Sequence, residues 1–253
     1  AWLRHRLRGE FPGVPWSFVR GLVRDGLCRR PDEGDSLRGY LRLMVSDLNP
    51  GWSRPGVEYV PLSVRLLADP GLLDDEIWRL FETDTNLFDD AWTRRHPQCP
   101  ADYESWSDAL IRLAGEGRVD RRRLLDASLA GLWASSNNSV LAGYHKLHSR
   151  LAPSADELDA RETAYRQLLG HRTGHVVGFA LRQLGLIVRR QPLAAEPTLA
   201  AMPPLFALPA KAQPLAALKL VGRLLKQEEL AGDLAEAAHA VLCEALRHPA
   251  SEV

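Results

Sequence analysis

A helical pattern that recurs every 37 residues is the strongest constraint on what this chain can fold into. It runs through the C-terminal half as four apolar columns, each with one residue from three successive repeats: Val140, Val177 and Pro214; Tyr144, Leu181 and Leu218; Leu147, Leu184 and Val221; Leu151, Val188 and Leu225. A period of this length is typical of stacked helix pairs, because one pair alone cannot bury its apolar face. The pattern therefore predicts an all-α fold, a right-handed α-solenoid of stacked helix pairs.

Apolar residues at helical spacing run through nearly the whole chain, and the alternation typical of strands is absent. In the C-terminal half this spacing, together with helix-capping signals, predicts helices at 121–133, 138–151, 155–170, 174–190, 196–208, 211–226 and 233–247. Ser154 and Glu157 fit a capping box at the start of the third. Pro203 and Pro204 should bend or break the fifth.

The N-terminal part is less regular. A helix is expected at about 35–48 with Asp35 as its N-cap, and an earlier one should carry Val19, Leu22, Val23 and Leu27. Segments 49–61 and 83–100 break the pattern. We therefore expect an N-terminal helical region at residues 1–100 and helical repeats at 101–253, joined in one continuous solenoid. The chain lacks a starting methionine, so we also expect it to be a fragment of a longer protein.

Charge excludes a strong general attraction to nucleic acid or membrane, because the formal net charge is +0. Its distribution is uneven: residues 1–30 carry +5, residues 31–110 carry −9 and residues 111–253 carry +4. The three cysteines form no CxxC pair, which fits a reducing compartment and predicts a cytoplasmic location. No apolar run is long enough to span a membrane, so no membrane partner is expected.

Part of the chain resembles a known family. The segments that carry the resemblance are residues 106–110 (WSDAL), residues 117–129 (GRVDRRRLLDASL), residues 144–148 (YHKLH) and residues 151–154 (LAPS) followed by Glu157. They are similar to an uncharacterised bacterial family, catalogued as a domain of unknown function, whose members look like HEAT-type repeat proteins. The resemblance covers about residues 60–230. It implies a HEAT-like solenoid in a bacterial protein, and it brings no catalytic residues.

Common catalytic motifs are missing, since no Walker A, GxGxxG, GxSxG or HExxH sequence occurs. The pairs His145–His148 and His171–His175 have spacings that can share a metal, but neither has a third ligand nearby in sequence. His96 and Cys99 likewise lack further ligands. We therefore expect no metal, no cofactor and no catalytic residue, although an enzyme with an unrecognised site stays an alternative.

Two acidic clusters invite a functional interpretation. Asp84, Asn86, Asp89 and Asp90 resemble a calcium loop in composition but lack its glycine and terminal glutamate, so solvated helix ends are the better interpretation. The run Asp74–Glu76 could supply paired carboxylates. Consecutive side chains on a helix diverge, however, and compensation of the helix dipole explains these acids better.

The strongest candidate site is a basic column. His145, Arg182 and Lys219 stand at equivalent positions of successive repeats, and basic residues near the helix ends extend it: Arg189, Arg190 and Lys226. Regular stacking would turn the column into a stripe, although a solvated helix face is the simpler interpretation. We expect a non-enzymatic scaffold that binds a partner protein. The alternative is a nucleic-acid-binding module, for which HEAT-like DNA glycosylases are the precedent by fold analogy.

Overall fold

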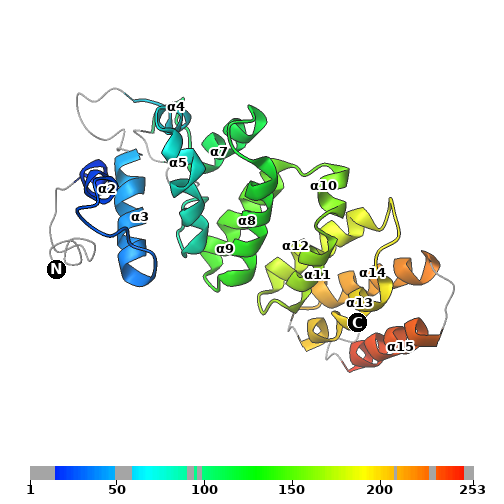
Figure 1. The fold of residues 1–253 in the computed structure, drawn as a ribbon. Coiled ribbons are helices and arrows are strands. Elements are labelled where there is room, and N and C mark those ends of the chain that lie inside the picture. The colour runs from blue at the N-terminus through cyan, green and yellow to red at the C-terminus, as the bar shows by residue number, and fades with distance from the viewer. Residues whose placement is uncertain are drawn as a thin grey trace. The chain divides into compact units, whose positions relative to one another are not determined.

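The computed structural model describes residues 15–48, 59–89, 94–95, 99–207, 210–227 and 232–247. Within these ranges every regular element is a helix, and none of the described residues forms a strand (Figure 1). The all-α prediction is confirmed for this part of the chain, whereas the right-handed solenoid stays a prediction. The chain divides into two compact units, residues 1–121 and 122–253. The expected division at residue 100 also stays a prediction.

The N-terminal unit consists of helices of 5 to 15 residues in its described part. Their bounds are α2 (Trp16–Arg24), α3 (Gly34–Leu48), α4 (Leu62–Leu67), α5 (Pro70–Asp74), the 3₁₀-helix η1 (Glu76–Glu82) and α7 (Trp106–Gly115). α2 packs on α3, where Trp16 meets the buried Tyr40 edge to face with ring centroids 5.8 Å apart. α4 contacts both α5 and α7, so consecutive helices share one apolar interior.

Local chemistry sets the helix boundaries in this unit. α3 begins at Gly34, so Asp35 lies in the first turn and is not the N-cap that we expected. α2 ends at Arg24, which leaves Leu27 beyond the helix and exposed. Asp69 caps α5 by accepting a hydrogen bond from the backbone N–H of Gly71 at 3.1 Å. α7 begins with a capping box in which Ser105 and Asp108 satisfy each other's backbone donors.

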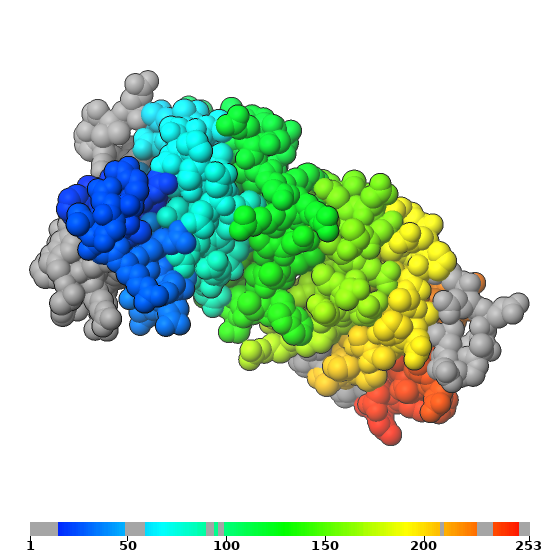
Figure 2. Space-filling model, in the orientation of Figure 1, coloured from blue at the N-terminus to red at the C-terminus, as the bar shows by residue number. Residues whose placement is uncertain are grey.

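The described part of the C-terminal unit contains helices of 3 to 16 residues. Their bounds are α8 (Arg121–Ala134), α9 (Asn138–Leu151), α10 (Ala155–Asp159), α11 (Glu162–Gln167), η2 (Leu168–Gly170), α12 (Gly174–Ile187), α13 (Ala195–Ala200), η3 (Pro203–Ala207), α14 (Ala212–Gln227) and α15 (Gly232–Leu246). α12 packs against α9 and α14, and α15 packs against α13, η3 and α14. In this unit the surface colours follow chain order, so segments adjacent in sequence are neighbours in space (Figure 2).

Two of the expected long helices are interrupted. The helix expected at 155–170 is split into α10, α11 and η2. The break lies at Arg161, whose buried guanidinium pairs with Asp126 and donates to the carbonyl of Arg122 at 3.0 Å. The helix expected at 196–208 is split into α13 and η3 just before Pro203, as the two prolines predicted.

The repeat columns identify core residues of this unit. Leu181, Leu184 and Val221 are buried as expected. Residues 37 positions apart can also touch each other, as His145 and Arg182 do. Leu218 was expected to be buried and is only half-buried. The buried stripe of α14 runs through Ala217, so Leu218, about 100° further round the helix, lies at its edge.

A close approach of α8 and α9 depends on a glycine. The Tyr144 ring lies directly against Gly131, and a Cβ there would stand 2.4 Å from Cζ of the ring. Tyr144 is 1% exposed, so it cannot swing out to solvent to make room. Any side chain at position 131 would therefore push the two helices apart.

Leu184→Ala tests whether the repeat register defines the core. Leu184 is fully buried on α12, so truncation should open a cavity and lower the free energy of unfolding by about 2–5 kcal/mol. Leu246→Ala on α15 is the matched control, because Leu246 is 83% exposed. Denaturant melts of both variants measure the effect. A loss below about 0.5 kcal/mol at Leu184 would contradict its assignment to the core.

Candidate functional site

A groove of about 500 Å³ lies between α12 and α14. Leu181 and Leu220 contribute an apolar floor, and Leu186 adds a rim that is 43% exposed. Four cationic side chains line the groove: Arg182, Arg189, Lys219 and Arg223. No acidic residue of the described chain lines it. The groove therefore combines an apolar surface with a concentration of positive charge.

The six residues of the predicted basic column do not all meet in this groove. Arg182, Arg189 and Lys219 line it, and His145 lies beside it on α9 through its contact with Arg182. Arg190 is not among the lining residues. Its guanidinium pairs with Asp159 at 2.7 Å and donates to the carbonyl of Ala155. Lys226 is exposed near the end of α14 and does not line the groove either.

Arg223 is a groove residue that the sequence did not reveal. It lies one turn beyond Lys219 on α14, where its side chain reaches the groove. The position 37 residues earlier is Leu186, so no basic column passes through Arg223. Helical spacing from Lys219 was the signal that could have found it, because residues four apart share a helix face.

The groove cations differ from three other arginines of this unit in their ion pairing. Arg161, Arg166 and Arg190 each pair with a carboxylate on the described chain. Arg182, Arg189, Lys219 and Arg223 are exposed, and among the described residues none of the four pairs with an acidic side chain. Their charge is therefore available to a ligand.

His145 holds Arg182 on the α9 side of the groove. The Nη2 group of Arg182 donates to Nε2 of His145 across 3.2 Å, which requires a neutral imidazole. Burial lowers the pKa of His145, and the charges of Arg182 and His175 lower it further. The imidazole edge also rests on the Phe179 ring, with centroids 4.9 Å apart. Arg182 thus has a partner that orients it without neutralising its charge.

Small residues open the groove between α12 and α14. In the preceding interface, between α9 and α12, the Phe179 ring packs against His145 and His148 with centroids 4.9 and 5.4 Å apart. Thirty-seven residues later, Ala216 stands at the place of Phe179 and Gly185 at the place of His148. Both small residues line the groove. The lining of the groove therefore has small residues where the preceding interface has two rings.

His145 and His148, whose spacing could share a metal although we expected none, lie in different surroundings. His148 is completely buried, and both of its ring nitrogens are hydrogen-bonded. Ser128 Oγ donates its proton to the Leu125 carbonyl at 2.7 Å, so Nδ1–H of His148 donates to Ser128 at 2.8 Å. The Tyr165 hydroxyl then donates to Nε2 at 2.8 Å. This chain fixes His148 as one neutral tautomer.

The remaining metal candidates do not converge. His171 Nδ1 accepts from the backbone N–H of Thr173, and its Nε2 faces the Ser135 carbonyl at 3.3 Å. His96 and Asp90 lie outside the described residues. In the part of the chain that the structure describes, no group of three or more His, Cys, Asp or Glu residues is arranged to hold a metal ion.

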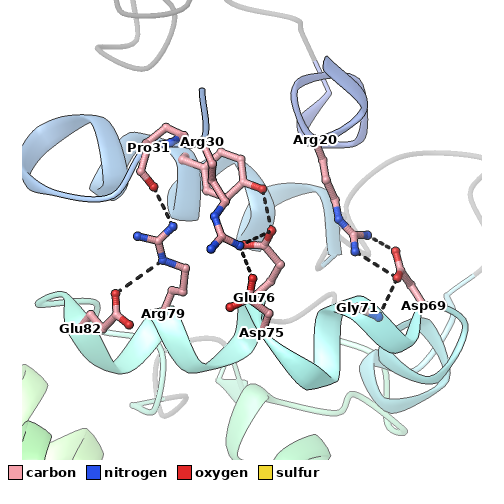
Figure 3. A network of polar contacts seen from close by, with 10 residues as sticks. Arg20, Arg30, Pro31, Asp69, Gly71, Asp75, Glu76, Arg79 and Glu82 are labelled. Carbon is pink, nitrogen blue, oxygen red and sulfur yellow. Dashed lines mark hydrogen bonds and ion pairs between the residues drawn. The ribbon is translucent and has the colours of Figure 1, made fainter. Parts of the chain in front are cut away.

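The acidic run Asp74–Glu76 serves a different purpose from the one we expected. It spans the break between α5 and η1, and Asp75 pairs with Arg30 (Figure 3). Glu76 is buried and accepts a hydrogen bond from the Tyr40 hydroxyl at 3.0 Å. Burial, followed by the charge of Glu76, raises the pKa of Tyr40. Tertiary contacts, more than compensation of a helix dipole, thus account for Asp75 and Glu76.

A further contact joins the segment between α2 and α3 to η1. Arg79 is buried and donates to the carbonyl of Pro31 at 2.7 Å, while its Nε faces Glu82 (Figure 3). Further along, Arg20 of α2 pairs with Asp69, the residue that caps α5 (Figure 3). These charged groups are engaged in holding the N-terminal unit together, which makes them poor candidates for catalysis.

Comparison with known proteins identifies a family. Residues 40–212 match the family described as a domain of unknown function (DUF6493), and this range is more than half of the chain. The chain belongs to the DUF6493 family. The resemblance to a family of unknown function is confirmed to this extent. The DUF6493 match ends at Ala212, the first residue of α14, so most of the α14 wall of the groove lies beyond it.

Searches of the curated proteins and of the solved structures find no match to the chain. Among the described helices, none is long and apolar enough to cross a membrane.

The buried His148 should make stability depend on pH. Burial, followed by the charge of Arg161, lowers its pKa to about 4. The unfolded chain has the ordinary value of about 6.5, so between these values the unfolded state binds the extra proton. Stability should therefore be full above pH 6.5 and should fall by about 3 kcal/mol as the pH drops to 4.

His148→Gln supplies the comparison for this prediction, because glutamine can hydrogen-bond but does not titrate in this range. Urea melts from pH 4 to pH 8 should show that the stability difference between the parent and this variant changes with pH in the stated direction. Parallel pH profiles for the two proteins would contradict the prediction.

Proposed function

We propose that this chain is a non-enzymatic α-solenoid scaffold of a bacterial cytoplasm, and that it binds a partner protein through the groove between α12 and α14. The observation that carries the proposal is the set of four exposed cations, without acidic partners on the described chain, around an apolar floor. Charges left unpaired at a concave surface attract a partner of opposite charge and give specificity. The partner should therefore present an acidic segment.

The lining of the groove favours protein over nucleic acid. Leucines and alanines make up much of it, and no aromatic side chain of the described residues lines it to stack on a base. The formal net charge of the chain is +0, whereas domains that bind nucleic acid usually carry a strong basic excess. A mixed apolar and cationic surface is typical of protein recognition.

The absence of common catalytic motifs also supports a binding role. Two of the residues that stood out in the sequence, His148 and Glu76, are engaged in structural contacts. The 37-residue register adds support for a repeat architecture, because such proteins bind partners on surfaces built from successive repeats.

Charge reversal of the groove tests the proposal. Arg182→Glu combined with Lys219→Glu should abolish capture of the native partner from cell extract, as measured by co-purification and mass spectrometry. The matched control is Arg42→Glu with Arg122→Glu, which reverses two exposed arginines outside the groove and should retain the partner.

Mobility-shift assays with generic DNA and RNA at low and moderate salt decide between the two kinds of partner. We expect no shift with the parent protein. A salt-sensitive shift that the groove variant removes and the control variant keeps would replace the protein-binding proposal with nucleic-acid binding.

A further inference from the structure

We infer that the groove between α12 and α14 takes an extended acidic peptide with one large apolar side chain, which lies against the small residues Gly185 and Ala216 and the exposed Leu186. This inference rests on the proposed function, because it names the chemistry of the partner segment that the same groove would bind. Three features of the groove support it: the small residues in its lining, the exposed leucine at its rim, and the spacing of the cations.

Small residues leave room in the lining of the groove. Phe179 and His148 are both fully buried in the interface between α9 and α12. The residues 37 positions later are Ala216 and Gly185, and both line the groove of about 500 Å³. An apolar side chain of a partner would therefore meet little obstruction from these two positions.

The lining around this space is apolar. Leu181 and Leu220 lie at its floor, and Leu186 forms a rim with 43% of its surface exposed. The residue 37 positions before Leu186 is Ser149, so the leucine is a feature of this groove and not of the repeat. Leu186 is exposed to water, so an apolar side chain that covers it gains free energy.

The cations set the arrangement of acids on the peptide. Arg182 lies on α12, and Arg189 lies in the turn directly after this helix, seven residues further along the chain. At the rise of a helix, seven residues separate the two backbones by about 10 Å. An extended peptide covers this distance with about three residues. Acids on both sides of one central apolar residue would therefore reach the cations at both ends. A simple phosphate would use the cations but leave the apolar space empty.

Selection from a random library tests this inference without knowledge of the native partner. Seven-residue random peptides between glycine–serine spacers are displayed and selected on the full chain. We expect enrichment of peptides with several Asp or Glu residues and one central Phe, Leu, Ile, Met or Trp. Arg182→Glu with Lys219→Glu should lose all of these acidic peptides.

Affinity measurements isolate the role of the apolar side chain. For an enriched peptide, replacing its central apolar residue with alanine should raise the Kd for the parent protein about tenfold or more in fluorescence anisotropy. Ala216→Phe, which places a ring in the lining of the groove, should remove most of this difference. Leu186→Ser should reduce it, and it serves in place of Ala216→Phe if circular dichroism shows that the latter does not fold.

Leu242→Ser is the matched control, because Leu242 is 44% exposed on α15 and does not line the groove. It should bind both peptides as the parent does. Acidic peptides that bind equally well with or without the apolar residue would overturn the inference and leave the acidic-partner proposal standing. If no acidic peptide is enriched while the charge reversal still removes the native partner, the inference is also wrong.

Discussion

The packing of α12 against α9 on one side and α14 on the other is the constraint on which the C-terminal unit depends. Phe179, Ala180 and Leu184 of this helix are fully buried, so α12 is the central apolar element between its neighbours. The His148–Tyr165 pair rests against the Phe179 ring, and the groove forms on the opposite contact. One helix thus contributes both to the aromatic cluster around Phe179 and to the lining of the groove.

Periodicity predicted the helices of the C-terminal half because burial there repeats along the chain. The helix at 138–151 and the start of the helix at 174 agree with the structure to the residue. Periodicity could not predict the break at Arg161, because the break depends on contacts with Asp126 and with the backbone of Arg122, about one repeat away. Apolar spacing contains no information about where a charged side chain finds its partner.

In the candidate site, too, the sequence predicted part of the arrangement and tertiary contacts decided the rest. The column of His145, Arg182 and Lys219 indicated the correct helix faces, because equivalent positions of stacked repeats lie near one another. Sequence alone could not show that Arg190 is neutralised by Asp159 while Arg189 is left without an acidic partner on the described chain. Nor did it indicate the groove, whose lining includes the small residues Gly185 and Ala216 and corresponds to no motif.

The position of the groove has a thermodynamic consequence. Its lining comes from both helices, with Leu181 and Arg182 on α12 and Ala216 and Lys219 on α14. A ligand that occupied it would therefore add contacts to both helices at once. Because such a ligand would bind the folded state alone, its binding would raise the melting temperature and would link the folding of this region to the concentration of the ligand.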